Sequence, residues 1–190
     1  MNVTERDILE IPSGYRSLEA GLTMAQLDDQ SARLLHDLQD ITPAELEWQS
    51  RPGLNTIGML LAHIAVVEVF WTQVGPERKS TFETESVLGI GIDDDGMPLP
   101  ENGRPPTALA GRAFPFYQEM LERARGYAKA GAARLAEQDL AGMFQRTRRN
   151  GAVEELNVRW VLYHMLEHFA GHYGQILLLR HQFRDARADH

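Results

Sequence analysis

Three histidines on one predicted helix carry the side chains best suited to chemistry. His164, His168 and His172 follow one another at intervals of four residues, so they share a helix face, with neighbouring Cβ atoms about 5–6 Å apart. Two adjacent imidazoles of this kind can bind one divalent metal ion. The outer two, His164 and His172, lie about 12 Å apart along the helix axis, which is too far for all three to reach the same ion easily. The spacing predicts that one adjacent pair, 164/168 or 168/172, chelates an ion, with His63 as the candidate third ligand from another helix.

An alternative interpretation is that these histidines are hydrogen-bonded core residues, as single buried imidazoles commonly are. His63 interrupts the apolar run of residues 57–70, so four imidazoles would have to be buried. Each one left without a partner costs about 1–3 kcal/mol, and a shared ion would satisfy three of them. The other histidines lie among polar residues or at the chain end. They are His36, His181 and His190.

Three neutral imidazoles around an ion leave an open position for water or an anionic substrate atom. The ion could activate water, as in a metal-dependent hydrolase, or stabilise the thiolate of a small cofactor, as in a thiol-dependent transferase. The chain has no cysteine, so a thiol must come from outside. A third alternative is a non-catalytic metal-binding helical bundle.

A hydrolase needs a general base near the ion, and two carboxylates are the candidates. Glu167 points about 100° around the helix from the adjacent histidine, and Glu68 lies five residues after His63 and off its face. Both are predicted to form salt bridges instead, which favours thiol transfer over hydrolysis. Gln175 shares the face of His172, so it is a candidate to bind a ligand in the pocket or to satisfy a helix neighbour.

Four long helices are predicted to position these side chains, because apolar residues recur along them at helical spacing. A Thr42-Pro43 start predicts a short helix between the first two, and a turn signal within residues 139–153 could close a small hairpin. No extended sheet is indicated, so we expect an all-α four-helix bundle. We expect a single domain over residues 1–190, with residues 1–14 as an N-terminal arm. The long helices are predicted at residues 15–40, 57–74, 107–137 and 157–184.

Polar residues and one proline mark where these helices begin. Asn55 or Thr56 is expected to cap the second helix, and Asn157 the fourth, through a side-chain oxygen that accepts a backbone hydrogen bond. Pro115 lies within the third predicted helix, where it should either kink the helix or mark its true start.

Residues 75–106 are rich in proline and glycine and contain the acidic triplet Asp93-Asp94-Asp95. We expect a long loop between the second and third helices, because this composition cannot bury enough apolar surface to join the bundle interior. Long loops inside compact domains are often functional. This loop is therefore expected to affect access to the site or association with a partner.

Composition narrows the classes of partner and the compartment. Nineteen basic against 27 acidic residues give a net charge of −8, which supplies no positive field for nucleic acid. The densest basic group is Arg146, Arg148 and Arg149. The first residues lack a signal-peptide pattern, and no apolar run approaches the roughly 20 residues of a membrane span. These two features, together with the lack of any cysteine to form disulfides, predict a cytoplasmic protein without a membrane partner.

Two stretches that carry the histidines resemble one known family. Residues 55–68, NTIGMLLAHIAVVE, are followed by Trp71, and residues 168–176 read HFAGHYGQI. They resemble the second-helix and fourth-helix signatures of the DinB-like (DinB/YfiT) metalloproteins. The order of elements, the Pro-Gly before the second helix and the long connection to the third also match. The resemblance covers about residues 16–184.

The resemblance implies a four-helix bundle that holds a divalent metal through three histidines. The family's ligands carry over to His63, His168 and His172, which leaves His164 one turn before the site, to orient a ligand or to pack in the bundle. The ligand set suits zinc, nickel, iron, cobalt or copper, of which zinc and nickel are expected. Some members are S-transferases or isomerases that use low-molecular-weight thiols. We therefore expect a thiol S-transferase acting on a small-molecule substrate, with a metal-dependent hydrolase as the alternative.

Two further features concern packing. Gly171 stands where many relatives have a polar or basic residue, so no substrate-binding role is carried over to it. With Gly174 it is expected to let a neighbouring helix approach closely. Relatives are often homodimers, and the nearly all-apolar second helix would fit a bundle face buried by a partner. A homodimer is therefore expected.

Overall fold

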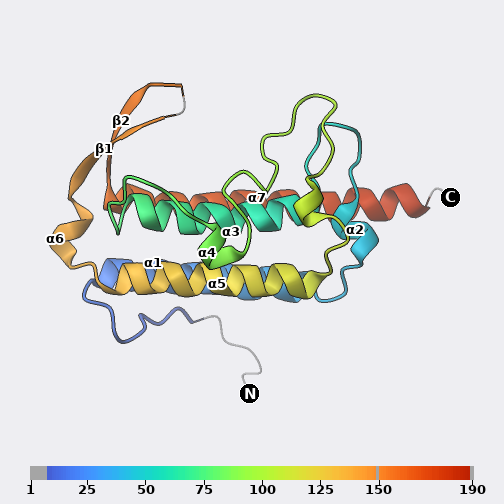
Figure 1. Ribbon diagram of the computed structural model, residues 1–190. Coiled ribbons are helices and arrows are strands. Elements are labelled where there is room, and N and C mark those ends of the chain that lie inside the picture. Colours follow the sequence, from blue (N-terminus) through green and yellow to red (C-terminus); the bar gives the residue numbers. More distant parts are fainter. Residues whose placement is uncertain (1–7, 149, 189–190) are drawn as a thin grey trace, which may run out of the picture.

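The computed structural model describes residues 8–148 and 150–188, so the predicted arm is described only from residue 8. Four long helices follow the predicted order. They are α1 (Leu18–Asp37), α3 (Ile57–Val74), α5 (Phe114–Ala133) and α7 (Val158–Ala188). Figure 1 shows them running alongside one another. Helices α1 and α3 each pack against both α5 and α7, so each long helix has two long neighbours.

The helices begin at the polar residues and the proline that the sequence predicted as their starts. Thr56, rather than the preceding asparagine, caps α3, because its Oγ1 accepts the backbone N–H three residues later at 3.2 Å. Asn157 does the same for α7 at 2.8 Å. The short helix α2 (Pro43–Glu47) is capped by Thr42. Pro115 lies in the first turn of α5, so it marks the true start of that helix, where its missing N–H costs no hydrogen bond.

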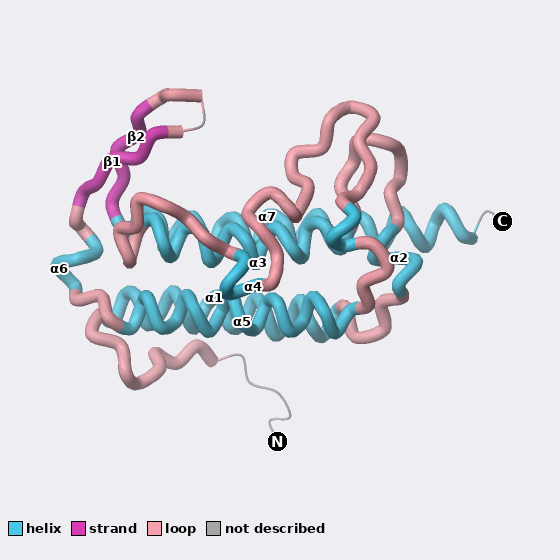
Figure 2. The backbone as a smooth tube through the Cα atoms, in the orientation of Figure 1, coloured by secondary structure: helices cyan, strands magenta, loops and turns pink. Residues whose placement is uncertain are grey.

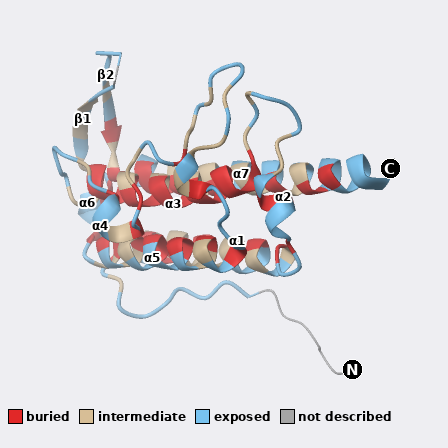
Figure 3. Cartoon of the chain, turned by 45° about the vertical axis from the view of Figure 1, so that its right-hand side comes forward, coloured by how far each residue is buried: buried red, intermediate tan, exposed pale blue. Residues whose placement is uncertain are grey.

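Helix α3 is apolar nearly all round because other elements of the same chain cover it. By length and composition its 18 residues could cross a membrane, contrary to our expectation that no run was long enough, but 83 % of them are buried inside the structure. Helices α5 and α7 pack on it, and Figure 3 shows it as largely buried. The bundle itself therefore buries this helix, so its apolar character gives no support to a homodimer.

A two-stranded antiparallel sheet separates the structure from the expected all-α class. After α6 (Glu137–Leu140), β1 (Met143–Thr147) pairs with β2 (Val153–Asn157), and the first residue of β1 lies opposite the last of β2. Gly151 turns the chain with a φ of 82°, within the turn signal seen in the sequence. Figure 2 shows this hairpin projecting away from the helices. The fold is therefore mostly helical, with a hairpin between the last two long helices.

Residues 75–106 form a structured connection, not a plain loop. They contain the short helix α4 (Glu85–Leu88), which packs on α5, and a 3-10 turn at Thr107–Leu109 follows them. Leu88 and Ile90 belong to the buried core. The expectation that this segment stays out of the bundle interior is therefore wrong. A few well-placed apolar residues anchor it, although its average composition is polar.

The tip of this connection is held by the loop that precedes α3. The backbone N–H of Gly53 donates to the carbonyl oxygen of Gly103 at 3.0 Å, and the two loops run side by side at the upper right of Figure 1. Gly53 has a φ of 85°, and a Cβ there would lie 2.0 Å from the carbonyl oxygen of Glu101. Only glycine can take this position, since the two backbones approach so closely.

Candidate metal centre

The side chains of three histidines meet between α3 and α7. His63 comes from the middle of α3, and His168 and His172 come from successive turns of α7. The Nε2 atom of His168 lies 3.1 Å from that of His63 and 3.0 Å from that of His172. Ring nitrogens of all three residues lie within 4.8 Å of one another. The 168/172 pair is therefore the one that faces His63, as the family resemblance implied.

Hydrogen bonds at the far side of two rings orient their lone pairs. Nδ1 of His63 lies 2.7 Å from Oδ2 of Asp95, and Nδ1 of His172 lies 2.9 Å from Oε1 of Gln175. Both oxygens are acceptors, so each Nδ1 carries the proton and each Nε2 keeps a lone pair. Carboxylate and carbonyl partners of this kind are typical of histidines that bind a metal, because they fix the tautomer and the ring orientation.

The arrangement of the nitrogens fits a divalent ion. Two imidazole nitrogens on one tetrahedral ion, each at about 2.0–2.1 Å from it, would be about 3.3 Å apart, close to the 3.0 and 3.1 Å observed. Hydrogen bonding alone fits less well. A neutral His168 can place one proton on Nε2, which can satisfy only one of the two facing lone pairs. The three residues thus have the donor set and the geometry of a metal site.

Burial and neighbouring imidazoles disfavour protonation of this centre. Burial, followed by repulsion from the charges that His172, His63 and His164 would carry when protonated, lowers the pKa of His168 to about 3. Burial also lowers the pKa of His172, although the hydrogen bond with Gln175 opposes this shift. At neutral pH the rings of His168 and His172 are therefore neutral, as metal ligands must be.

His164 lies one turn before the pair and packs among aromatic rings. Its ring stacks on Trp160 with centroids 4.7 Å apart, and it meets Trp71 edge-on at 5.1 Å. Its Nδ1 lies 2.9 Å from a carboxylate oxygen of Glu167. The ring centroids of His164 and His168 are 5.7 Å apart. Of the two roles considered for His164, this geometry favours packing beside the site.

The α7 surface around His172 is open. A Cβ added at Gly171 or Gly174 would meet no atom within 4 Å, so the expectation that these glycines admit a neighbouring helix is wrong. Gln175 forms its hydrogen bond with a neighbour on the same helix, which was one of the two roles considered for it. Because that neighbour is His172, the contact still bears on the metal centre.

The two carboxylates considered as general bases are both engaged by other side chains. Glu68 is 4 % exposed and accepts hydrogen bonds from Arg125 at 2.5 and 3.1 Å, which confirms the predicted salt bridge between helices. Glu167 lies on the surface, where hydrogen bonds with His164 and Tyr163 lower its pKa. Neither carboxylate faces the three Nε2 atoms, so neither is placed to take a proton from water there.

An open cavity of about 560 Å³ lies beside the centre and reaches His63. This volume is ordinary for a small-molecule site. Helix α3 and the 75–106 connection supply its apolar lining, and the tip of the hairpin supplies basic side chains. The lining residues are His63, Val66, Val67, Phe70, Phe82, Ile92, Asp93, Asp95, Met97, Arg146, Thr147 and Arg148.

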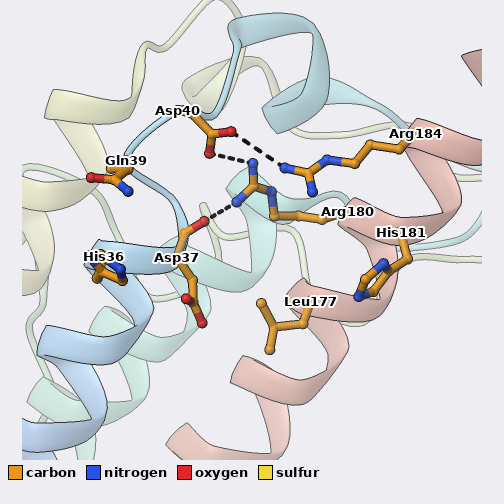
Figure 4. Close-up of a pocket in the computed structure, with 8 residues that line it drawn as sticks. All are labelled: His36, Asp37, Gln39, Asp40, Leu177, Arg180, His181 and Arg184. Atoms are coloured by element: carbon orange, nitrogen blue, oxygen red, sulfur yellow. Dashed lines mark hydrogen bonds and ion pairs between the residues drawn. The ribbon is translucent and has the colours of Figure 1, made fainter.

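A second cavity, of about 470 Å³, lies near the C-terminal end of α7 and is lined by His36 and His181. Figure 4 shows Arg180 bound to Asp40, at 2.7 Å, and to the backbone carbonyl oxygen of Asp37, with Arg184 also paired with Asp40. Within residues 8–148 and 150–188, the triad above is the one group of three or more histidines or carboxylates close enough to share an ion. His190 lies outside the described residues.

The fold and the site define a helical protein whose three converging histidines are consistent with a divalent metal. A family model described as mycothiol S-transferase matches residues 23–185. Because the match covers most of the chain, the protein belongs to this family, within the DinB-like superfamily, and the resemblance carried by the two histidine motifs is confirmed. A comparison with curated proteins gives no match.

Asp95 is the residue of the centre that sequence reasoning missed. The signal was the triplet Asp93-Asp94-Asp95, but nothing in three adjacent carboxylates selects the third. The fold makes the choice, because Asp94 turns back to accept the backbone N–H of Gly91 at 2.7 Å. Asp95 is 2 % exposed and points at His63. Such a selection depends on the path of the loop, which local spacing does not encode.

Proposed function

We propose that this protein is a metal-dependent S-transferase that joins a low-molecular-weight thiol, mycothiol in the family's description, to an electrophilic small molecule. His63, His168 and His172 would hold the ion, zinc or nickel. The observation that carries the proposal is the convergence of three Nε2 atoms beside an open cavity, which His63 lines. In the described part of the chain the cluster of candidate ligands stops at three, which leaves a position for a substrate atom.

The residues of the chain would prepare this site for a thiol. When bound, the ion would supply positive charge that lowers the pKa of a thiol presented to it. Asp95 and Gln175 keep two imidazoles in the tautomer that directs Nε2 inward. The apolar lining, with Phe70 and Phe82 in edge-to-face contact, would hold the acceptor and exclude water. In the substitution, the thiol sulfur would bond to the acceptor carbon as the bond between that carbon and its leaving group breaks. The thiol proton passes to solvent, and the leaving group departs as an anion, which is chloride for a chloroarene.

Thiol transfer is supported over hydrolysis because neither carboxylate considered as a general base, Glu68 or Glu167, is placed to take a proton from water at the three nitrogens. Hydrolysis needs a group that takes a proton from water, and Glu68 and Glu167 are held by Arg125 and His164. A thiol with an ordinary pKa of about 8.5 needs only a modest shift to ionise near neutral pH. The open cavity also supports catalysis over a purely structural ion, since a structural site is closed by a fourth ligand.

The test compares thiol transfer with hydrolysis on the same preparations. Protein without a His-tag is stripped with a chelator, reloaded with zinc or nickel, and incubated with mycothiol and chlorodinitrobenzene or, separately, with nitrophenyl acetate. We expect metal-dependent formation of the thioether, followed by mass spectrometry, and no metal-dependent ester cleavage. Ester cleavage without thioether formation would establish the hydrolase instead. Stoichiometric metal with neither reaction would favour the non-catalytic bundle.

Replacing Asp95 with alanine is expected to weaken metal binding by about 10–100-fold, the usual effect of losing the partner that orients a histidine ligand. The carboxylate fixes the Nδ1–H tautomer of His63, so without it the ring can turn or change tautomer. Competition with a chromogenic chelator measures the affinity. Asp94→Ala is the matched control from the same triplet and should bind metal normally. Equal affinity in the two variants would show that the Asp95 contact does not tune the site.

Stability should depend on pH through His168. The folded-state pKa of about 3 lies below the ordinary value of 6.5, so the unfolded chain binds more protons between these values. The contribution of His168 to the free energy of unfolding is therefore fully present above about pH 6.5, and it is lost as the pH falls towards 3. Melting temperatures of the metal-loaded protein should fall more steeply between pH 7 and pH 5 than those of the stripped protein, because protons also displace the ion. Parallel curves for the two forms would argue against metal bound by imidazoles.

A further inference from the structure

We infer that Arg146 and Arg148 make the cavity selective for acceptors that carry a carboxylate on a hydrophobic body. The inference rests on the proposed function, because it names the class of second substrate for the same site. Both arginines come from the hairpin and line the cavity that reaches His63. Arg149, the third member of the basic group, lies outside the described residues.

The two arginines share a single carboxylate, so their face of the hairpin carries a net positive charge, because Glu155 lies opposite Gln145 on the other face. Nε and Nη2 of Arg146 both lie 2.6 Å from Oε1 of Glu154, and Nε of Arg148 lies 2.6 Å from Oε2. Glu154 thus uses both of its oxygens and offsets one of the two charges. A guanidinium keeps several N–H donors in a planar fork that matches a carboxylate. The arrangement is therefore suited to take one more carboxylate, from a ligand.

One of the two guanidinium groups is held in place and the other can reach a ligand. Arg146 lies over the rings of Trp71 and Phe70, with its Cζ 4.6 and 5.5 Å from their centroids, and its side chain is 21 % exposed. The side chain of Arg148 is 56 % exposed. Arg146 would therefore fix the position of the charge, and Arg148 would form the more direct contact with an anionic group.

The rest of the cavity divides into an apolar part and an acidic edge. Val66, Val67 and Phe70 line it from α3, where a hydrophobic body can pack. Asp95 is already committed to His63 and to the backbone N–H of Met97. Its charge would repel a carboxylate at the edge formed by the 75–106 connection. A hydrophobic acid would therefore place its carboxylate at the hairpin and its body along α3.

Direct binding tests this inference without requiring turnover. Phenylbutyrate and its neutral amide are titrated calorimetrically into stripped and zinc-loaded protein, as wild type and as Arg148→Gln. We expect the wild type to bind the acid about 10-fold more tightly than the amide, with or without zinc. Arg148→Gln should weaken binding of the acid about 5-fold and leave the amide unchanged. Arg159→Gln, an exposed arginine paired with Glu19 on another part of the surface, should change neither.

The variant Glu154→Gln is expected to change the affinity for the acid in the opposite direction to Arg148→Gln. Removing the carboxylate that occupies both arginines should tighten binding of the acid at least 2-fold, whereas a loss of packing alone would weaken both ligands. A preference for the acid that appears only with zinc and survives Arg148→Gln would place the carboxylate at the metal and overturn the inference. Equal affinity for acid and amide would overturn it as well. Neither result depends on whether S-transfer is observed, so the two proposals can fail separately.

Discussion

Replacement of His168 by alanine is expected to abolish stoichiometric binding of zinc or nickel. His168 is the central member of the triad, with its Nε2 3.1 Å from that of His63 and 3.0 Å from that of His172. Without it, two imidazoles on different helices remain, fewer than the three protein ligands usual even for an open site. Metal content after dialysis and isothermal titration of the stripped protein measure the loss, and circular dichroism shows whether the helices persist. His63→Ala and His172→Ala should behave in the same way.

The variant His164→Ala separates this ligand set from the other pair that the spacing allows. His164 packs on Trp160 and Trp71 beside the centre, so its loss should weaken binding by a smaller factor than loss of a ligand. Retention of metal by His172→Ala together with complete loss in His164→Ala would mean that the 164/168 pair chelates the ion. The two variants remove the same group from positions about two turns apart on one helix, which makes them a matched comparison.

A second large effect is expected from the buried ion pair that links α3 to α5. The side chains of Arg125 and Glu68 are 9 % and 4 % exposed, and Arg125 also reaches Asp28 on α1 at 3.0 Å. Arg125→Met would leave the Glu68 carboxylate buried without its partner. We expect this to lower the free energy of unfolding by about 3–5 kcal/mol, the usual consequence of breaking a buried pair on one side. Urea denaturation at neutral pH measures it.

The double variant Arg125→Met/Glu68→Leu tests the cause of that loss. If an unpaired buried charge is responsible, removing both charges should restore most of the stability, since apolar side chains can replace a buried pair at little cost. As a control, Arg33→Met removes one partner of the exposed pair with Asp29 on α1 and should change stability by less than about 1 kcal/mol. Equal losses in the single and double variants would instead show that the pair contributes net stability.

The helices could be predicted because local chemistry defines them. The caps Thr42, Thr56 and Asn157 act on backbone N–H groups three residues later, and such short-range contacts are visible in a sequence. Pro115 was informative for the same reason, because its ring restricts the turn that contains it. Histidine spacing narrowed the ligand pair to two choices, and the family motifs selected one. The structure places that pair beside His63.

The parts that could not be predicted depend on contacts between distant segments. Asp95 meets His63 across 32 residues, and the tip of its connection is held through Gly53. The sequence showed a turn signal for the hairpin. It did not show that Arg146 of the hairpin would lie over Trp71 or that the hairpin would line the cavity. Leu88 and Ile90 reached the core although the composition of their segment predicted otherwise. The average composition of a segment indicates how polar it is as a whole. Two apolar residues are nevertheless enough to anchor such a segment to the core.

The hairpin and the 75–106 connection both lie between long helices in the chain, and both line the cavity beside the triad. The three histidines of the candidate centre, by contrast, come from the long helices themselves, and His63 precedes His168 by 105 residues in the chain. Changes of length or sequence in connections are tolerated far better than changes in packed helices. Selection could therefore alter which molecules fit the cavity without rebuilding the histidine triad. Within a lineage of such proteins, acceptor preference should diverge faster than reaction chemistry.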